Sequence, residues 1–234
     1  MKKQNQMVFD SVGVFLSVYK EKFGTPRQSG LVSQAQGKIV LTDKFANADY
    51  ISGIESFSHL WVLFYFNQSE SIPSKRMARP PRLGGNKKVG VFASRTNFRP
   101  NNIGMSVVKL ERVTINKDSI EINVTGADII DQTPILDIKP YIPYADIIDD
   151  AAGGYASERP TPVLQINDKT IGKVFSLSDS LRRMIHNVIS LDPRPAYRRD
   201  RVDEKIYGMT IGEYEVKWKV EGEEAILLSI EPVY

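Results

Sequence analysis

The chain has 234 residues and a formal net charge of +3; 41% of its residues are hydrophobic and 25% are charged, as in a globular protein with one large domain or two small ones. It contains no cysteine and two histidines, which excludes disulfides, thiolate metal sites and a cysteine nucleophile, and we expect no bound metal. The basic segment 1–6 precedes a stretch interrupted by Asp10, Ser11 and Gly13, so we expect no signal peptide, no membrane span and a cytoplasmic location.

The first third of the chain is rich in β-branched and aromatic residues, which favour strands. The predicted elements, in chain order, are a strand at 8–19, a loop at 20–30, a strand at 37–42, a helical turn within 49–55 and a strand at 59–66. In the segment 59–66, seven apolar residues follow His59 without interruption. A run of this length and composition indicates a fully buried strand.

The segment between Ser71 and Leu110 is basic throughout. It holds nine lysines and arginines and no acidic residue, although the net charge of the whole chain is only +3. Its prolines and glycines give the loop a defined shape, and 88–93 is predicted to be a short strand that carries Arg95 at its end. So local an excess of charge predicts an anionic partner, and a solvated basic loop without a ligand is the alternative.

An acidic stretch follows the basic segment. The segments 103–113 and 120–124 alternate like two strands of a hairpin around an Asn-Lys-Asp turn. Between Asp128 and Asp150 lie six aspartates against one lysine, with a possible strand at 135–138. We expect these aspartates to act as partners of the basic segment, which would offset part of its charge; a magnesium site is the weaker alternative, and their spacing matches no calcium-binding loop.

The last third of the chain predicts a smaller unit. The segment 151–162 is the best linker in the sequence, with two adjacent glycines and two prolines. Ser178 is expected to cap a helix, whose apolar stripe consists of Leu181, Met184, Ile185, Val188 and Ile189. A second hairpin is predicted from strands at 209–220 and 225–230.

These elements predict a mainly β protein. We expect a β-barrel domain at 1–150, a linker at 151–162 and a small α+β domain at 163–234. A strand followed by a GxGxxG turn and a helix does not occur in the sequence, so a Rossmann fold is not expected.

Several motifs, in their order and spacing, resemble the TsaA-like (TrmO) family. They are 22–30 (KFGTPRQSG), 58–61 (SHLW), 79–85 (RPPRLGG), 90–95 (GVFASR), 98–101 (FRPN), 103–106 (IGMS), 137–141 (DIKPY) and 192–198 (DPRPAYR). The resemblance covers nearly the whole chain. It implies a β-barrel and an S-adenosylmethionine-dependent methyltransferase that acts on N6 of the threonylcarbamoylated adenosine at tRNA position 37, next to the anticodon. It also implies a homodimer with the cofactor near the subunit interface.

The resemblance assigns cofactor contacts to four parts of the chain. They are Pro26, Arg27 and Gln28; Asn67 and Gln68; Arg95 and Met105; and Thr125, Gly126, Ala127 and Asp128. Members of the family often carry His-Glu at the positions of Asn67 and Gln68. Whether these two residues act through side chain or backbone therefore stays open.

The residue types fit this cofactor. Arg27 or Arg95 can donate two hydrogen bonds to a carboxylate, Asp128 can accept from a cationic or hydroxyl group, and Met105 offers a soft apolar contact for adenine. No side chain stands out as the proton acceptor, and the candidates are Asp128, Asp131 and Tyr141.

The expected contact with the tRNA anticodon stem-loop is basic. Its residues are Arg79, Arg82, Lys87, Lys88, Arg99, Arg194, Tyr197, Arg198 and Arg199. A flipped base would need an aromatic shelf, for which Phe98 and Tyr197 are candidates. Two alternatives remain open, a barrel that binds RNA or nucleotides without catalysis, and a family member with another substrate.

Overall fold

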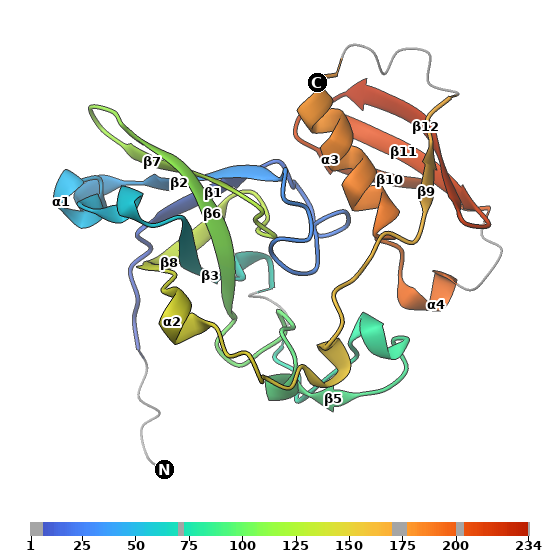
Figure 1. Cartoon of the computed structure of the whole chain (residues 1–234), viewed down its shortest axis with the longest axis horizontal. Coiled ribbons are helices and arrows are strands. Elements are labelled where there is room, and N and C mark those ends of the chain that lie inside the picture. Colours follow the sequence, from blue (N-terminus) through green and yellow to red (C-terminus); the bar gives the residue numbers. More distant parts are fainter. Residues whose placement is uncertain (1–6, 70–72, 170–176, 200–203, 234) are drawn as a thin grey trace.

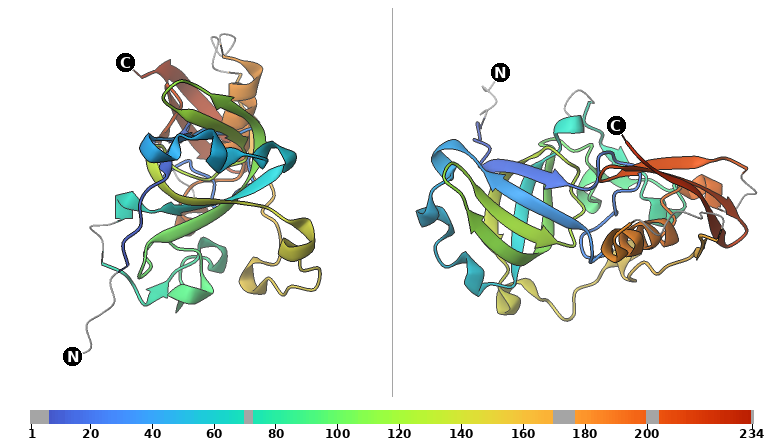
Figure 2. Two further views of the ribbon diagram at one scale, coloured as in Figure 1. Left: turned by 90° about the vertical axis from the view of Figure 1, so that its left-hand side faces the viewer. Right: turned by 90° about the horizontal axis from the view of Figure 1, so that it is seen from above.

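The computed structural model describes residues 7–69, 73–169, 177–199 and 204–233 (Figure 1). The segment 1–6, on which the expectation about a signal peptide partly depends, lies outside the described residues. The chain forms a closed antiparallel barrel and a four-stranded sheet covered by a helix. In the right-hand view of Figure 2 these two units lie at opposite ends of the long axis.

Six strands close the barrel in the order β1-β2-β7-β6-β3-β8. They are β1 (Gly13–Ser17), β2 (Gln36–Leu41), β3 (His59–Tyr65), β6 (Ile103–Ile115), β7 (Ile120–Thr125) and β8 (Thr133–Pro140). The predicted hairpin at 103–124 is confirmed as β6 and β7, which pair from Lys109–Thr125 to Ile115–Ile120. The mainly β fold expected from the sequence is also confirmed.

The barrel core consists of inward-facing apolar side chains. Its fully buried members include Phe15, Ile39, Leu60, Val62, Ile122 and Ile135. The prediction that 59–66 is buried on both faces was wrong, because buried and half-buried residues alternate along β3. In a barrel strand one face packs inside and the other points outward, so Trp61 and Leu63 lie on the outer face.

Two further segments differ from the sequence predictions. Residues 8–12 precede β1 without strand structure. Of the strand expected at 88–93 only β5 (Val89–Gly90) forms, paired with β4 (Met77–Ala78), and a 3-10 turn (Val91–Ala93) follows. The apolar run 88–93 does not make a longer strand because its partner, β4, has only two residues with which to pair; Phe92 beyond it is 81% exposed.

Short helices lie between the barrel strands and after the last of them. The α-helical ones are α1 (Ala48–Ile51) and α2 (Pro143–Asp146), and the 3-10 turns are η1 (Asp43–Phe45), η2 (Ile54–Ser56), η3 (Asn67–Ser69), η4 (Pro81–Leu83), η5 (Val91–Ala93) and η6 (Gly154–Ala156). The helical turn expected within 49–55 is thus confirmed as α1 followed by η2.

The C-terminal unit is a sheet with one main helix. The sheet has the order β10-β11-β12-β9, with β9 (Gln165–Asn167), β10 (Tyr207–Ile211), β11 (Tyr214–Glu221) and β12 (Glu224–Pro232). The predicted strand 209–220 is divided because Gly212, at φ 61°, makes a turn between β10 and β11. The predicted helix is confirmed as α3 (Asp179–Ser190), where Ser178 Oγ accepts a hydrogen bond from the Leu181 backbone N–H.

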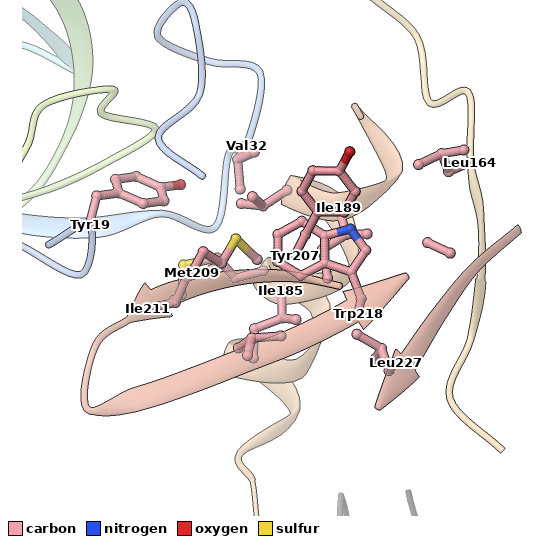
Figure 3. Close-up of a cluster of buried hydrophobic side chains, with 14 of the residues drawn as sticks. Tyr19, Val32, Leu164, Ile185, Ile189, Tyr207, Met209, Ile211, Trp218 and Leu227 are labelled. Atoms are coloured by element: carbon pink, nitrogen blue, oxygen red, sulfur yellow. The ribbon is translucent and has the colours of Figure 1, made fainter. Parts of the chain in front are cut away.

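A second hydrophobic core lies under this sheet (Figure 3). Its buried members from the C-terminal part include Met184, Ile185, Ile189, Met209, Trp218 and Leu227. Tyr19, Val32 and Ala35, which precede β2, are buried in the same cluster. The loop between β1 and β2 therefore belongs to both units, and the division at 151–162 stays a prediction.

The segment expected to be a free linker is attached to the barrel loops. The Tyr155 hydroxyl donates to the Ala93 carbonyl at 3.1 Å, and Arg159 Nη2 donates to the Gly30 carbonyl at 2.6 Å. Arg82 donates to the Glu158 carbonyl. The segment thus packs along the basic loop on its way to β9.

Candidate functional site

Two segments distant in sequence meet at one end of the barrel. The Gly30 backbone N–H donates to the Gly126 carbonyl at 2.8 Å, and the Gly126 N–H donates to the Ala35 carbonyl at 2.9 Å. Gly126 has φ 78°, a conformation that glycine adopts without strain, and a Cβ at this position would lie 3.7 Å from the Gly30 Cα. The loop after β1 is therefore held against the end of β7.

Gln28, Arg95 and Asp128 come together beside this contact. Arg95 Nη1 donates to Gln28 Oε1 at 2.7 Å. Ser106 Oγ donates to Asp128 Oδ1 at 2.5 Å, and both Arg95 and the Ser29 backbone act on the carboxyl group of Asp128. Residues from three of the four parts of the chain that the resemblance assigns to the cofactor thus come together within one chain.

Asp128 is the electrostatically unusual residue of the site. Burial raises the pKa of Asp128 from 3.8 to about 6, against the lowering effects of the Ser106 hydroxyl and Arg95. Burial, and next the charge of Asp128, raise the pKa of Tyr19 above its ordinary value, so the phenol lies near this carboxylate. A carboxylate that is costly to ionise would be stabilised by a further cation.

The other expected cofactor residues are placed around this centre in different ways. Arg27 is partly exposed, and its Nη2 donates to the Arg194 carbonyl at 3.3 Å. Asn67 Nδ2 donates to the Gln132 carbonyl at 3.3 Å, and Gln68 is exposed. The side chain of Asn67 therefore makes a hydrogen bond inside the protein.

The remaining expected residues differ in exposure. Pro26 is half-buried, and Ala127 is 3% exposed. Thr125 Oγ1 donates to Glu111 Oε1 at 2.8 Å. Met105 is 49% exposed on the outer face of β6, whereas its neighbour Ser106 points inward to Asp128, because side chains alternate along a strand. Within one chain, Met105 faces away from Asp128.

The structure separates the three candidates for proton acceptor. Asp131 is occupied, because its Oδ1 accepts from the Ser17 backbone N–H at 2.7 Å and its Oδ2 pairs with Lys20 Nζ at 2.8 Å. The Tyr141 N–H donates to the His59 carbonyl, at the start of β3, whereas Asn67 follows the end of that strand. At about 3.3 Å per residue, the full length of β3 separates Tyr141 from the cofactor residues, and only Asp128 lies among them.

Two hollows open on the barrel surface. One has a volume of about 300 Å³ and is lined by residues 55–58 and 110–112. The other has a volume of about 430 Å³ and is lined by residues of β1 and β2 together with Asn123, Asp131 and Gln132. Both volumes are in the range of small-molecule pockets, but neither is lined by Gln28, Arg95 or Asp128.

Most of the expected RNA contacts lie on one side of the molecule. Arg79, Arg82, Lys87 and Lys88 are exposed. This loop adjoins α4 (Ala196–Arg199), because a Cβ at Gly85 would lie 3.9 Å from the Ala196 Cβ. Tyr197 on α4 is 62% exposed and packs against the Arg198 guanidinium at 5.8 Å.

Arg194 and Arg99 differ from this expectation. Arg194 is 2% exposed, and its guanidinium pairs with Asp192, so it is not on the surface and we do not include it among the RNA contacts. Arg99 Nη1 is half-buried and donates to the Ser94 carbonyl at 2.9 Å, which gives it a role inside the loop. Phe98 has Lys22 and Lys75 against its ring, at 4.9 and 4.4 Å, so its face is already covered.

The acidic stretch does not pair with the basic segment as expected. Among the ion pairs of the described residues, Asp131 pairs with Lys20 and Asp137 with Lys139. Neither lysine belongs to the basic segment. Arg95 acts on Asp128 through its charge alone, and Lys109 pairs with Glu111. Arg79, Lys87 and Lys88 are exposed and take part in none of the ion pairs of the described residues.

Sequence reasoning missed Ser106 and Gln132. Ser106 is a polar residue at an inward position of β6, between the inward-facing Gly104 and Val108, and it is 3% exposed. A buried hydroxyl needs a partner, so this position was a detectable signal. Gln132 contributes its backbone carbonyl, which accepts a hydrogen bond from Asn67 Nδ2. Its φ of 61° cannot be inferred from the residue type.

Two features are absent from the described part of the chain. No helix there is long and apolar enough to cross a membrane. No group of three or more histidine, aspartate or glutamate side chains there has the arrangement of a metal site.

Both units of the chain match family models. Residues 14–147 match the tRNA-methyltransferase O N-terminal domain, and residues 165–233 match the TrmO C-terminal domain.

Similar proteins cover the full length. The tRNA (adenine(37)-N6)-methyltransferase of Escherichia coli (strain K12) is 40% identical over 229 residues, 96% of this chain and 97% of that protein. The putative S-adenosylmethionine-dependent methyltransferase RcsF of Pseudomonas aeruginosa is 37% identical over 212 residues, which cover 88% of this chain and 90% of that protein. The crystal structure of TrmO from the same species superposes with a TM-score of 0.79 at 29% identity, covering 99% of this chain and 100% of that one. The chain belongs to the TrmO family.

Proposed function

We propose that the chain is an S-adenosylmethionine-dependent methyltransferase that modifies N6 of the threonylcarbamoylated adenosine at tRNA position 37, in the cytoplasm. The observation that carries this proposal is the 40% identity to a protein named tRNA (adenine(37)-N6)-methyltransferase, which spans 96% of the chain. The convergence of Gln28, Arg95 and Asp128 gives it a structural basis.

The groups at this site fit the cofactor. Exposed guanidinium groups of Arg95 and Arg27 can bind its carboxylate. The carboxylate of Asp128, which burial makes costly to ionise, gains from a cation or a ribose hydroxyl beside it. Met105 supplies an exposed thioether for an aromatic ring.

The cofactor, when bound, supplies a methyl group on a positively charged sulfur. The task of the chain is to hold N6 of the adenosine in line with that group, and orientation of this kind contributes on the order of 7–11 kcal/mol. N6 also loses a proton. Asp128 is the candidate acceptor within the site, and with a pKa of about 6 it is mainly ionised at neutral pH.

We also propose a homodimer. Met105 and Ile103 lie on the outer face of β6 and are 49% and 37% exposed. A second subunit packed against this face would bring a thioether to a cofactor that one chain holds from the Asp128 side only. The exposed loop with Arg79, Arg82, Lys87 and Lys88 would then bind the anticodon stem-loop through its phosphates.

The test is methyl transfer from tritium-labelled S-adenosylmethionine to tRNA that lacks only this methyl group. Incorporation at adenosine 37 is expected, and it should disappear with tRNA that lacks the threonylcarbamoyl group. A folded dimer that incorporates no label into any such tRNA would contradict the proposal. Calorimetric titration with S-adenosylmethionine alone then identifies a barrel that binds RNA without catalysis, because such a protein gives no heat of binding with this cofactor.

A further inference from the structure

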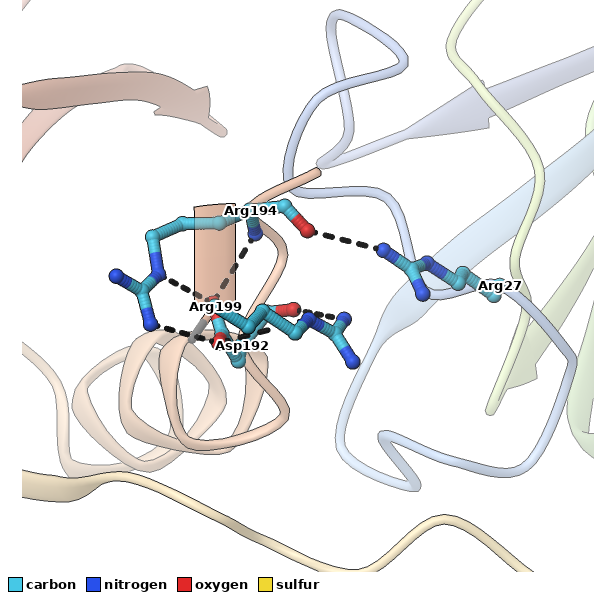
Figure 4. Close-up of polar contacts among 4 residues, drawn as sticks. All are labelled: Arg27, Asp192, Arg194 and Arg199. Atoms are coloured by element: carbon cyan, nitrogen blue, oxygen red, sulfur yellow. Dashed lines mark hydrogen bonds and ion pairs between the residues drawn. The ribbon is translucent and has the colours of Figure 1, made fainter. Parts of the chain in front are cut away.

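Asp192 is a buried carboxylate at the end of α3, outside the barrel. It is 2% exposed, and its Oδ1 and Oδ2 accept from Arg194 Nε at 2.8 Å and Arg194 Nη2 at 2.9 Å (Figure 4). Arg199 donates from Nη2 to the Asp192 carbonyl at 2.6 Å, and its Nε lies 3.5 Å from Oδ2. Two arginines thus surround one carboxylate.

This arrangement fixes the backbone of the turn after α3. Asp192 has φ 50°, a left-handed conformation that aspartate and asparagine tolerate better than most residues. Its Oδ1 also accepts from the Arg194 backbone N–H at 3.2 Å. A buried ion pair held by two side-chain hydrogen bonds and one backbone hydrogen bond allows little variation in geometry, so the Arg194 carbonyl has a defined position.

That carbonyl is the point at which the turn contacts the barrel. Arg27 Nη2 donates to it at 3.3 Å (Figure 4). Partial burial and then the charge of Arg199 lower the pKa of Arg27, while Asp192 raises it. Among the ion pairs of the described residues none involves Arg27, so a backbone carbonyl orients this guanidinium and leaves its charge for an anionic group.

The same loop is attached to the C-terminal sheet at a second point. Gly24 has φ 89° and lies so close to β10 that a Cβ there would be 2.6 Å from Met209 Sδ. With Gly24 packed on β10 and Arg27 bound to the turn after α3, the loop that carries Gln28 is supported from outside the barrel.

We propose that Asp192 is a positioning residue of the cofactor site: it fixes the Arg194 carbonyl, which orients the Arg27 guanidinium toward the cofactor carboxylate. This inference rests on the proposed function, in which Arg27 is a cofactor contact. Asp192 itself touches neither cofactor nor tRNA.

Calorimetric titration of the full-length protein with S-adenosylmethionine tests this role. Asp192→Asn keeps the shape and the tolerated backbone conformation and removes the charge that holds the two arginines. We expect the Kd of this variant for S-adenosylmethionine to be about five- to tenfold higher, because the Arg27 guanidinium is no longer oriented to donate its hydrogen bond to the cofactor carboxylate. Asp168→Asn is the matched control, because Asp168 pairs with Arg182 and His186 on α3, away from Arg27, and its Kd should equal that of wild type.

A double-mutant cycle separates positioning from a general structural effect. If Asp192 acts through Arg27, Asp192→Asn has no further effect on Kd in an Arg27→Ala background. An equal loss in both backgrounds, or wild-type affinity of Asp192→Asn, overturns the proposal. Wild-type protein that binds no cofactor contradicts the proposed function itself, whereas Arg27→Ala with unchanged affinity and normal tRNA methylation contradicts only this inference.

A second variant covers the case in which Asp192→Asn does not fold. Arg199→Lys keeps the positive charge at a side chain that is 30% exposed, but it lacks the Nη2 group that binds the Asp192 carbonyl. We expect a Kd about two- to threefold higher, and no added effect in the Arg27→Ala background. An unchanged Kd of the folded variant counts against the proposal.

Discussion

At the scale of single residues, the site combines one carboxylate whose pKa is raised with guanidinium groups that differ in their exposure to solvent. Asp128 is raised in pKa by burial, Arg95 is exposed and bound to Gln28, and Arg194 is inaccessible. The sequence alone does not distinguish these arginines, because the burial of Arg194 depends on a carboxylate two residues away and on packing against α3. The family motif identified Arg95 and Asp128. The hydrogen bond of Arg95 to Gln28 and that of Ser106 to Asp128 could be found only in the structure.

Asp128 makes the stability of the protein depend on pH. Because its pKa in the folded state is about 6 rather than 3.8, the folded state keeps a proton that the unfolded state releases between about pH 4 and 6. The free energy of unfolding therefore falls as the pH rises through this window. The free energy of unfolding of Asp128→Asn, relative to that of wild type, should therefore increase by about 1–3 kcal/mol as the pH rises from 4 to 7. Urea unfolding at each pH measures it.

The matched control for this measurement is Asp118→Asn, in the exposed turn between β6 and β7. Its free energy of unfolding should follow that of wild type at every pH. A difference between Asp128→Asn and wild type that stays constant from pH 4 to 7 would show that the carboxylate is not buried as described.

Arg95→Ala is expected to weaken cofactor binding without unfolding the barrel. Arg95 lies in an exposed loop, and its described hydrogen bond goes to Gln28, so the substitution removes a cofactor-binding group and little packing. A hydrogen bond between charged groups contributes about 1.5–3 kcal/mol, which predicts a Kd increase of roughly 10- to 100-fold. Titration calorimetry and circular dichroism measure the two effects, with Arg112→Ala, on the exposed part of β6, as the control.

Retained affinity together with loss of secondary structure would contradict the assignment of Arg95, since the residue would then stabilise the fold instead of binding the cofactor.

At the scale of elements, predictions were best where periodicity and turn chemistry agreed. The hairpin of β6 and β7 has alternating residues and a polar turn, and α3 has both a serine cap and an apolar stripe. The strand expected at 88–93 and the undivided strand at 209–220 failed for different reasons. Local composition favours strands in both, but the first has no neighbouring sheet beyond β4, and the second contains a glycine that turns the chain.

The barrel strands depend on side chains that meet in the interior. Leu60 is 0% exposed in the barrel core, and Leu60→Ala removes buried methyl groups and leaves a cavity. The free energy of unfolding should fall by about 2–4 kcal/mol, which urea denaturation with tryptophan fluorescence measures. Ile115→Ala, at a position 60% exposed on the same sheet, is the control and should change it by less than about 0.5 kcal/mol.

At the scale of the whole molecule, the basic loop and α4 form one side, and the loop that carries Arg27 and Gln28 contacts the turn after α3. The sequence indicated the charge of this surface, but not that the segment 151–162 would run along it. Hydrogen bonds from Arg82 and Tyr155 attach that segment to the loop. Such bonds between a linker and a loop have no pattern in sequence, because they use backbone carbonyls.

Binding of tRNA should depend on the exposed cations of this side. Arg82→Ala combined with Lys88→Ala is expected to weaken tRNA binding and to reduce the slope of log K against log salt by about 1 for each phosphate that the variant no longer neutralises. Filter binding between about 50 and 200 mM salt measures both. The control is Lys44→Ala, which changes a side chain that is 66% exposed and paired with Asp10 near α1, and it should leave the slope unchanged. Equal slopes for wild type and all variants would show that the RNA does not bind at the basic loop.

The burial of Tyr19, Val32 and Ala35 under the C-terminal sheet also orders events during synthesis. The barrel has all its strands once β8, ending at Pro140, has left the ribosome. The apolar side chains of the loop after β1 gain their cover only when β10 and β11 follow, some tens of residues later, which is several seconds of translation at roughly 5–20 residues per second. The nascent barrel thus passes through a stage in which the loop after β1 is still uncovered, and the last strands to emerge complete it.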